Sequence, residues 1–193
     1  MTEALKKLNE VVLFDLEATC DDKTLVFNFD NETIEIGAVK IIDHEIVGEF
    51  STFIQPRDTV ITPFCTELTT ITEADILHAP DFLTAAAAFE QFIGSAKILS
   101  WGNYDRNQLR KDFERHKAPL PYWLKRHINF KKEFAIYKDI QPCGMKKALA
   151  LCNISLEGTH HRGIDDARNI AKIYLQLKSE LDPFWHIKQK KKR

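Results

Sequence analysis

Residues 11–20, VVLFDLEATC, constrain the fold more than any other part of this chain. Their apolar beginning predicts a buried strand, and two carboxylates, Asp15 and Glu17, stand at its end. Successive side chains of a strand point to opposite faces, so these two acids share one face and Leu16 points to the other. Burying carboxylates is costly unless positive charge meets them. The strand is therefore expected to run into a site that supplies positive charge.

The other patterns surround this strand with a mixed sheet and helices. Further strands are predicted over residues 33–42, 45–54 and 96–101, the first two as a hairpin. Helices are predicted over residues 82–94, 104–117, 143–153 and 163–181, and a shorter one follows the capping-box pair Thr72 and Asp75. A strand meander followed by alternating helix and strand is typical of a single α/β domain.

The length and the apolar content indicate one domain. A chain of 193 residues that is 44% apolar can bury a sizeable core. We assign residues 1–182 to the domain and residues 183–193 to a basic C-terminal tail. No apolar run approaches the roughly 18 residues that span a bilayer, so we expect a soluble, cytoplasmic protein without a membrane partner. The four cysteines form no CxxC pair, and reduced thiols are expected.

Charge is distributed unevenly along the chain. Residues 1–90 carry 18 acidic and 5 basic residues, a net charge of −13, whereas residues 91–193 carry 10 and 22, a net charge of +12. The densest basic segment is 106–132, and the last six residues, KQKKKR, add five more cations. Such a split indicates a surface that meets an anionic partner, although a solvated helix face and a frayed tail would give the same pattern.

A third acid lies just after the second predicted buried strand, in SWGNYDRNQL. A helix is expected from Tyr104, which places Asp105 in its first turn. An acid at this position can simply complement the helix dipole. Asp105 also precedes Leu109 and Phe113 at helical spacing, however, which puts it on the apolar stripe that faces inward. We therefore favour a functional role for Asp105.

The segment HHRGIDDARNIAKIYLQL, residues 160–177, offers two further acids. Helical spacing puts Asp165 on a polar stripe with Asn169, Lys172 and Gln176, and Asp166 on an apolar stripe with Ile170, Ile173 and Leu177. Asp166 is therefore expected to face the core, and Asp165 to face water. His161 lies five residues before Asp166, at the entrance to the helix, where a lone histidine is more often a cap or a surface residue.

Four carboxylates thus aim inward from two strand ends and two helices, and few cations are available to match them. Divalent metal ions are the obvious source of neutralising charge. Ligand sets made only of oxygen favour Mg²⁺ or Mn²⁺ over zinc or copper. Four carboxylates suit two ions roughly 4 Å apart, the arrangement used for in-line displacement at phosphorus.

These residues resemble the DEDDh group of the RNase T and DnaQ-like 3′-to-5′ exonucleases, within the ribonuclease H-like superfamily. The resemblance is greatest to the enhanced-RNAi and histone-mRNA exonuclease branch, which includes KapD-like proteins. It is carried, in chain order, by FDLEATC, EIGAV, FIQPRDTVITPFCTELTTIT, WGNYD and HRGIDDARNIAKI. DxE alone is weak evidence, but five motifs in order make a specific match. The resemblance implies a mixed five-stranded sheet flanked by helices.

The resemblance also implies roles for the acids and the histidine. Asp15, Glu17, Asp105 and Asp166 would hold two Mg²⁺ ions, for which Mn²⁺ could substitute. His161 would be the general base, because its usual pKa suits removal of a proton from water near neutral pH. Asp165 and His160 have no such role.

Substrate-binding residues are implied by position in the motifs. Backbone at Ala18 or Thr19 would meet the 3′ hydroxyl of the terminal nucleotide. Tyr104 and Phe64 would stack on bases, although packing against the protein is a strong alternative for both aromatic residues. The expected partner is the 3′ end of a single strand, with RNA favoured over DNA, and the products are nucleoside monophosphates.

Two alternatives remain open. The chain could be a regulatory or binding module that has lost catalysis, although decay of that kind usually removes an acid or the histidine, and all five positions are filled here. A 3′-to-5′ DNA exonuclease is disfavoured by the ATC that follows Glu17 and by the WGNYD and FCTELT segments. The loop over residues 21–33 departs from the family pattern and leaves strand preference open.

Overall fold

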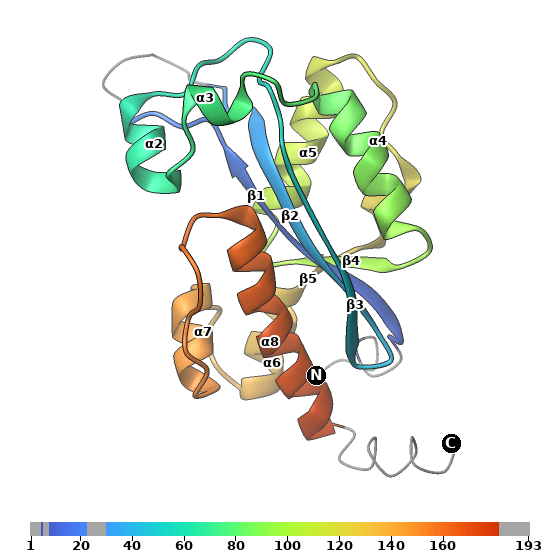
Figure 1. Ribbon diagram of the computed structural model, residues 1–193. Helices are drawn as coiled ribbons and strands as arrows, with labels where there is room; N and C mark the ends of the chain where they lie inside the picture. The colour runs from blue at the N-terminus through green and yellow to red at the C-terminus, as the bar shows by residue number, and fades with distance from the viewer. Residues whose placement is uncertain (1–4, 6–7, 23–29, 182–193) are drawn as a thin grey trace.

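The computed structural model describes residues 5, 8–22 and 30–181 (Figure 1). The predicted basic tail of residues 183–193 lies outside the described residues, as does most of the 21–33 loop. Within the described ranges, none of the helices combines the length and the apolar character needed to cross a membrane.

Five strands form one mixed sheet in the order β3-β2-β1-β4-β5. An antiparallel meander is built from β1 (Glu10–Ala18), β2 (Thr33–Ile42) and β3 (Glu45–Phe53). The two remaining strands, β4 (Lys97–Ser100) and β5 (His127–Asn129), run parallel to β1. The strand that carries Asp15 and Glu17 is therefore the central strand, paired on both edges.

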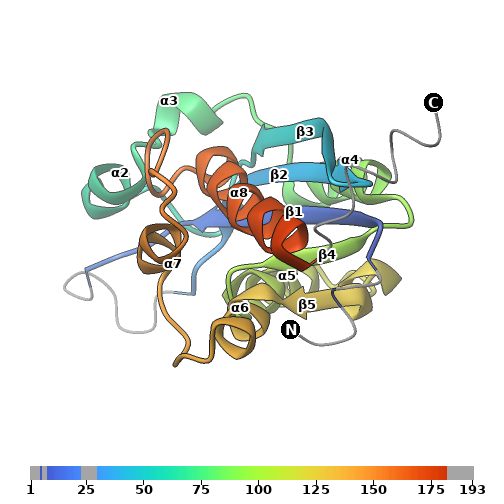
Figure 2. The ribbon, with the colours of Figure 1, turned by 90° about the horizontal axis from the view of Figure 1, so that it is seen from below.

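Alternation along β1 supplies apolar residues to both faces of the sheet. Val12 and Phe14 pack under α4 (Phe82–Ile93) and α5 (Tyr104–Arg115). Val11 and Leu13 pack on the opposite face under α6 (Phe130–Lys138), α7 (Met145–Leu151) and α8 (Gly163–Leu181). Figure 1 shows the two groups of helices on either side of the sheet, and Figure 2 shows α8 lying across β1 and β2. By the same alternation, Asp15 and Glu17 point to the α8 face.

Two short helices, α2 (Pro63–Thr69) and α3 (Glu73–Ile76), close the end of the sheet where β1 finishes. The hydroxyl of Thr62 caps α2 by accepting from the Cys65 N–H. The predicted capping box of α3 is present, since Thr72 and Asp75 bond reciprocally. Beneath these helices lies a small third apolar cluster, formed by Ile34, Ile61, Cys65, Ile71 and Ile76.

The predicted α/β domain with a mixed five-stranded sheet is confirmed, and most predicted elements agree with the structure to within a few residues. The periodicity did not predict α2, α6, β5 or the 3₁₀ helix η1 (Tyr122–Arg126). With three residues, β5 is too short to show alternation, and pairing with β4 defines it. The first strand continues four residues beyond the apolar run, to Ala18, because β2 pairs with it along its whole length.

A contact between two glycines sets how closely α8 approaches the sheet. A β-carbon on Gly37 of β2 would overlap the backbone of Gly163 and Ile164. A β-carbon on Gly163 would lie 3.1 Å from the Gly37 nitrogen and 3.2 Å from the Asp15 carbonyl oxygen. Position 37 must therefore be glycine for the first turn of α8 to rest directly on the strand next to Asp15.

We predict that Gly37→Ala lowers the free energy of unfolding by about 1–3 kcal/mol, because the methyl group forces α8 away from β2. Urea denaturation measured by circular dichroism checks this value. Gly48→Ala in β3 is the matched control, since its β-carbon would meet only an ordinary contact, 3.5 Å from Phe92. Equal losses of stability in the two variants would contradict the close approach of α8.

Candidate active site

An open pocket of about 390 Å³ lies where the end of β1 meets the first turns of α5 and α8. The titratable side chains that line it are those of Asp15, Glu17, Tyr104, Asp105, His161 and Asp166, together with His160. All four predicted acids and the predicted histidine therefore face one cavity. They are drawn from three segments that are far apart in the sequence.

Three of the four acids lie close enough together that they could hold one metal ion. One carboxylate oxygen from each of Asp15, Glu17 and Asp166 lies within 4.8 Å of the other two. Asp105 lines the same pocket from the first turn of α5 but does not belong to this set of three. The structure thus brings together the predicted oxygen ligands, with Asp105 on the α5 side of the pocket.

Burial and mutual repulsion perturb these acids. Burial, followed by the charges of Asp105 and Glu17, raises the pKa of Asp15 well above its ordinary value. Burial, followed by the charge of Asp166, raises the pKa of Glu17 to about 8. Burial also raises the pKa of Asp105 to about 6, although hydrogen bonds from Ser100 and from the Leu16 N–H act in the opposite direction. The charged forms are therefore disfavoured until a cation joins them.

The donor set fits divalent metal ions. In the described part of the chain, no lysine or arginine lies within ion-pair distance of Asp15, Glu17 or Asp105. Clustered carboxylates without a lysine or arginine in ion-pair contact, all offering oxygen, are the ligands that hard divalent ions select. The residues present therefore suit the metal site that the sequence predicts.

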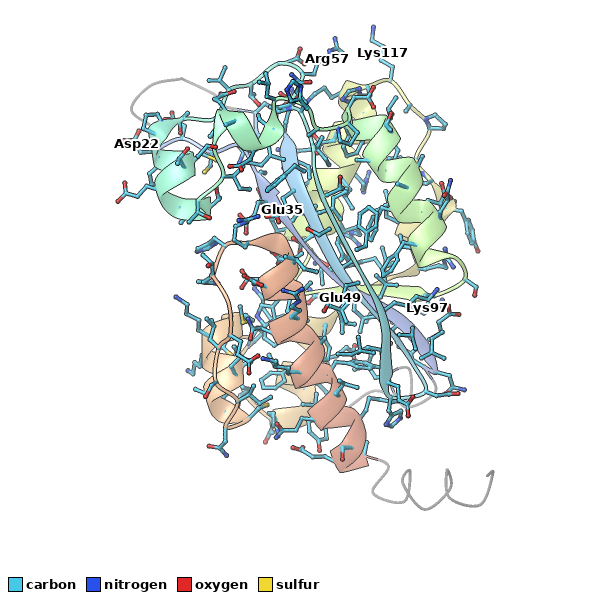
Figure 3. All side chains as sticks on the ribbon, in the orientation of Figure 1. Asp22, Glu35, Glu49, Arg57, Lys97 and Lys117 are labelled. Carbon is cyan, nitrogen blue, oxygen red and sulfur yellow. The ribbon has the colours of Figure 1, made fainter. Side chains whose placement is uncertain are left out.

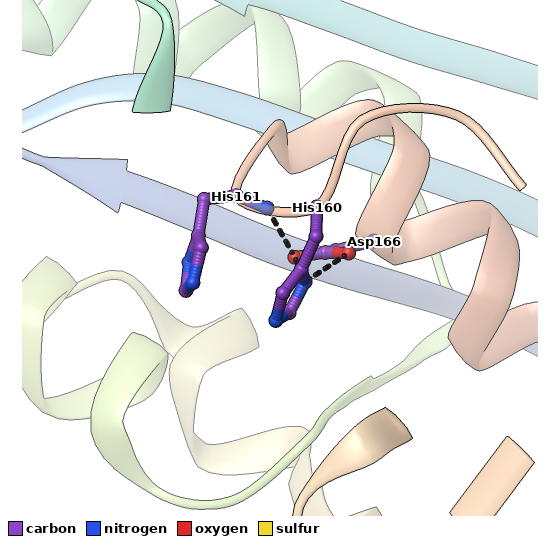
Figure 4. Close-up of side chains that lie close together, drawn as sticks. All are labelled: His160, His161 and Asp166. Carbon is purple, nitrogen blue, oxygen red and sulfur yellow. Dashed lines mark hydrogen bonds and ion pairs between the residues drawn. The ribbon is translucent and has the colours of Figure 1, made fainter. Parts of the chain in front are cut away.

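The two histidines contact Asp166 in a way that the sequence did not predict (Figure 4). Spacing paired His161 with Asp166, but the imidazole that contacts the carboxylate belongs to His160, whose Nδ1 lies 3.0 Å from both Asp166 oxygens. His161 reaches Asp166 through its backbone N–H, at 3.1 Å. The reason is the backbone of His161, which has a φ of 65° and turns the N–H toward Asp166.

The His161 side chain remains available to a substrate. Its ring stacks on that of His160, with the centroids 4.0 Å apart, and lines the pocket. Burial, followed by the neighbouring charge of His160, lowers the pKa of His161. A neutral imidazole at neutral pH is the form that accepts a proton.

The prediction that Asp165 faces water holds only in part, since its side chain is 20% exposed. The Asp165 carboxylate accepts from the Thr159 N–H at 2.8 Å and pairs with Arg168 at 3.0 Å. Asn169 is fully buried and bonds both the N–H and the carbonyl of Glu157. These residues hold the segment just before the two histidines, because a loop folds back over this face of α8 and covers it.

Glu35 is a buried acid that the sequence reasoning missed. It lies directly opposite Glu17 in the pairing of β1 with β2, and Figure 3 shows it beside the first turn of α8. Its carboxylate accepts from the Gly163 N–H at 3.0 Å and from Arg162 Nε at 3.2 Å. Glu35 therefore fixes the entrance of α8, where the histidines and Asp166 lie. The signal was available in EIGAV, as an acid on the same strand face as the close-packed Gly37.

The predicted substrate residues are placed less uniformly. Tyr104 lines the pocket and keeps 54% of its surface exposed. Phe64 is exposed on α2 and is not among the residues that line the pocket. Thr19 is buried, and its N–H donates to the Glu32 carbonyl at 2.8 Å. Ala18 is also buried, beside Cys65. The substrate roles of these four residues stay predictions.

Comparison with known proteins agrees with this arrangement. A family model described as RNase T, exonuclease, matches residues 12–174. The chain is 27% identical to the 3′-5′ exonuclease eri1 of Schizosaccharomyces pombe, over 90% of this chain and 69% of that protein. It is 29% identical to the probable 3′-5′ exonuclease KapD of Bacillus subtilis, over 86% of this chain and 83% of that protein. It is 32% identical to the PolC-type DNA polymerase III of Clostridium perfringens, over 90% of this chain but only 12% of that protein.

Solved structures share the fold. The nuclease domain of 3′hExo, a DEDDh family member bound to rAMP, superposes with a TM-score of 0.84 at 22% identity, over 90% of this chain and 94% of that one. Escherichia coli exonuclease I in complex with a dA16 oligonucleotide superposes with a TM-score of 0.70 at 14% identity, over 93% of this chain and 42% of that one. The predicted ribonuclease H-like exonuclease fold is confirmed.

We predict that the crowded acids make the metal-free chain less stable as pH rises. A carboxyl whose pKa is raised by folding contributes stability at low pH, and this contribution is lost as pH rises from its ordinary pKa of 4.5 through about 8, the value for Glu17. Between pH 5 and pH 8 in EDTA, wild type should lose on the order of 2 kcal/mol or more relative to Glu17→Gln.

Urea denaturation of both proteins at each pH measures the difference. Addition of Mg²⁺ at pH 8 should restore stability to wild type more than to the variant, because the ion binds the charged form. If the free energy of unfolding changes with pH equally in wild type and Glu17→Gln, folding does not raise the pKa of Glu17.

Proposed function

This chain belongs to the RNase T exonuclease family, and from that premise we propose that it hydrolyses single-stranded RNA from the 3′ end and releases nucleoside monophosphates. The observation that carries the proposal is the convergence of Asp15, Glu17 and Asp166 within 4.8 Å, with Asp105 and His161 lining the same pocket. Enzymes of this class are 3′-5′ exonucleases that depend on divalent metal ions.

We assign four side chains as the metal ligands, namely Asp15, Glu17, Asp105 and Asp166. The metal ions are Mg²⁺, for which Mn²⁺ can substitute. When bound, two such ions activate the attacking water and stabilise the leaving 3′ oxygen. The protein contributes the rigid spacing of the ligands, since β1 fixes Asp15 and Glu17 and α8 fixes Asp166. Preorganised carboxylates need no rearrangement when the ions bind.

His161 is the general base in this proposal. Its ring is exposed to the pocket, makes no hydrogen bond to Asp166, and has a pKa below its ordinary value. His160, in contrast, has its Nδ1 against Asp166 and occupies that carboxylate in the absence of a metal ion. A base must be both neutral and free to reach the water, and His161 meets both conditions.

The single strand enters the pocket with its 3′ nucleotide next to the acids. Tyr104 offers an aromatic face to a base at the pocket, and Phe64 offers a second one farther out on α2. We assign binding of the substrate 3′ hydroxyl to the backbone at Ala18 or Thr19. Of these two residues, Thr19 already donates its N–H to Glu32, which favours Ala18.

RNA is favoured over DNA as the substrate because one relative, the ERI1 exoribonuclease 2 of Danio rerio, resembles this chain over 91% of its length. The PolC relative keeps a DNA substrate as the alternative. The four cysteines are free, in keeping with a reducing compartment, and we assign the activity to the cytoplasm. A binding module without catalysis is disfavoured because the acids share one pocket with a free imidazole.

The proposed function is tested by incubating the chain with 5′-labelled single-stranded RNA, single-stranded DNA and duplexes in parallel. With Mg²⁺ or Mn²⁺, single-stranded RNA should shorten stepwise from the 3′ end and release nucleoside monophosphates. Asp15→Asn should abolish hydrolysis while the circular dichroism spectrum is retained, because a metal ligand is lost. Full activity in EDTA, or release of oligonucleotides from the 5′ end, would contradict the proposal.

A second prediction separates the two histidines. His161→Ala should lower kcat about 10²- to 10⁴-fold with little change in RNA binding, because only the base is removed. In wild type, kcat should rise with pH over a range below the ordinary histidine pKa of 6.5, since burial lowers the pKa of His161.

His160→Ala should keep kcat within about tenfold of wild type and lower the Mg²⁺ concentration needed for half-maximal rate, because an imidazole no longer competes for Asp166. Titration of both variants with Mg²⁺ gives the two quantities. If His160→Ala is the inactive variant and His161→Ala the active one, the base is His160.

A further inference from the structure

A second cavity, of about 260 Å³, opens between α5 and the 3₁₀ helix η1. Its lining combines cationic side chains with an apolar floor and consists of Arg106, Arg110, Leu120, Pro121, Leu124 and Lys125. We call this cavity the α5–η1 groove. No residue that lines it also lines the acidic pocket.

The three cations of the α5–η1 groove have few acidic partners among the described residues. Arg106 bonds only the side chain of the adjacent Asn107, at 3.1 Å. Arg110 forms an ion pair with Glu114 at 3.8 Å, but both side chains are exposed, and such a pair contributes little. Lys125 lies over the Tyr122 ring, 5.7 Å from its centroid. The groove therefore presents positive charge that acids of the protein neutralise only in part.

Other cations on the same helix are paired. Arg115 bonds Asp30 at 2.7 Å, and Lys111 lies 3.5 Å from the same carboxylate. Arg115 and Lys111 thus pair with an acid from a distant part of the chain, whereas Arg110, within the described residues, pairs only with Glu114 of its own helix.

The groove begins next to the acidic pocket. Tyr104 and Asp105 of the first turn of α5 line the pocket, and the next residue, Arg106, lines the groove. A strand whose 3′ end lies at the acids can therefore pass around the first turn of α5 into the groove. The covalent neighbours Asp105 and Arg106 fix the two cavities relative to each other.

We propose that the α5–η1 groove binds the phosphodiester backbone of the substrate strand a few nucleotides upstream of the 3′ end. This inference rests on the proposed exonuclease function and adds to it a second, non-catalytic site. Guanidinium groups match phosphate oxygens in geometry, and Arg106 and the weakly paired Arg110 provide two of them. The acidic pocket then holds only the terminal nucleotides, and the groove adds binding affinity for longer strands.

The apolar part of the groove favours nucleic acid over an acidic peptide. Leu120 is exposed and Pro121 lies beside it, which leaves a surface on which the face of a base can rest. Tyr122, next to the groove, is 73% exposed. Cations interspersed with apolar and aromatic faces are the combination that binds single strands without sequence preference.

The test compares Arg110→Gln/Lys125→Gln with a control of equal charge, Lys97→Gln/Lys117→Gln. Lys97 and Lys117 are exposed, do not line the groove, and lie far apart in Figure 3. Binding of a fluorescein-labelled 12-mer of uridine is measured by anisotropy in EDTA over a series of salt concentrations, so that no hydrolysis is needed.

For the groove variant, Kd at 0.1 M salt should rise by roughly tenfold, and the slope of log K against log salt should fall by about 1.4, the value for two contacts with a single strand. With Mg²⁺, the ratio of kcat/KM for the 12-mer to kcat/KM for a dinucleotide should fall in the groove variant. The control variant should keep the Kd and the ratio of wild type.

The outcomes are distinct. The proposed binding of nucleic acid by the groove would be overturned if Kd and slope were equal in the groove and control variants. It would also be overturned if polyglutamate competed for binding as well as unlabelled polyuridine of equal charge. A wild type that binds the 12-mer but hydrolyses no substrate with any divalent ion would instead overturn the proposed function. A wild type that hydrolyses the 12-mer while the groove variant keeps the wild-type ratio would refute the groove alone.

Discussion

Repulsion among carboxylates at the end of β1 is the constraint on which the rest of the structure depends. Burial and neighbouring charge raise the pKa of Asp15, and they raise that of Glu17 to about 8, so a folded chain without metal holds these groups at a cost. A fold tolerates such a cost only where packing elsewhere fixes the backbone. Central placement of β1, paired on both edges and covered on both faces, supplies that rigidity.

Two contacts transmit that rigidity to α8. Gly37 lets the helix rest against β2, and Glu35 binds the Gly163 N–H and Arg162 at its entrance. Arg162 in turn lies over the Phe53 ring, 5.2 Å from its centroid. Together these contacts hold Asp166 at a fixed distance from the acids of β1. Glu35 shows how a buried acid can serve the site without pointing at the reacting atoms.

Helix α5 serves both cavities of the molecule. Its first turn presents Asp105 to the acidic pocket and Arg106 to the α5–η1 groove, so negative and positive surfaces meet across one peptide bond. Negative charge suits bound metal ions, and positive charge suits phosphates. The three groove cations all belong to residues 91–193, the half of the chain with a net positive charge.

The sequence by itself determined the central strand, the α/β class, and the inward direction of Asp105 and Asp166, because strand alternation and helical period are local properties. It did not determine β5, the role of Glu35 or the histidine that touches Asp166. Those depend on chain segments far apart in sequence: β5 needs β4, and Glu35 needs both its register with Glu17 and the first turn of α8. The left-handed backbone of His161 then decides which imidazole contacts Asp166, and spacing along a regular helix carries no information about it.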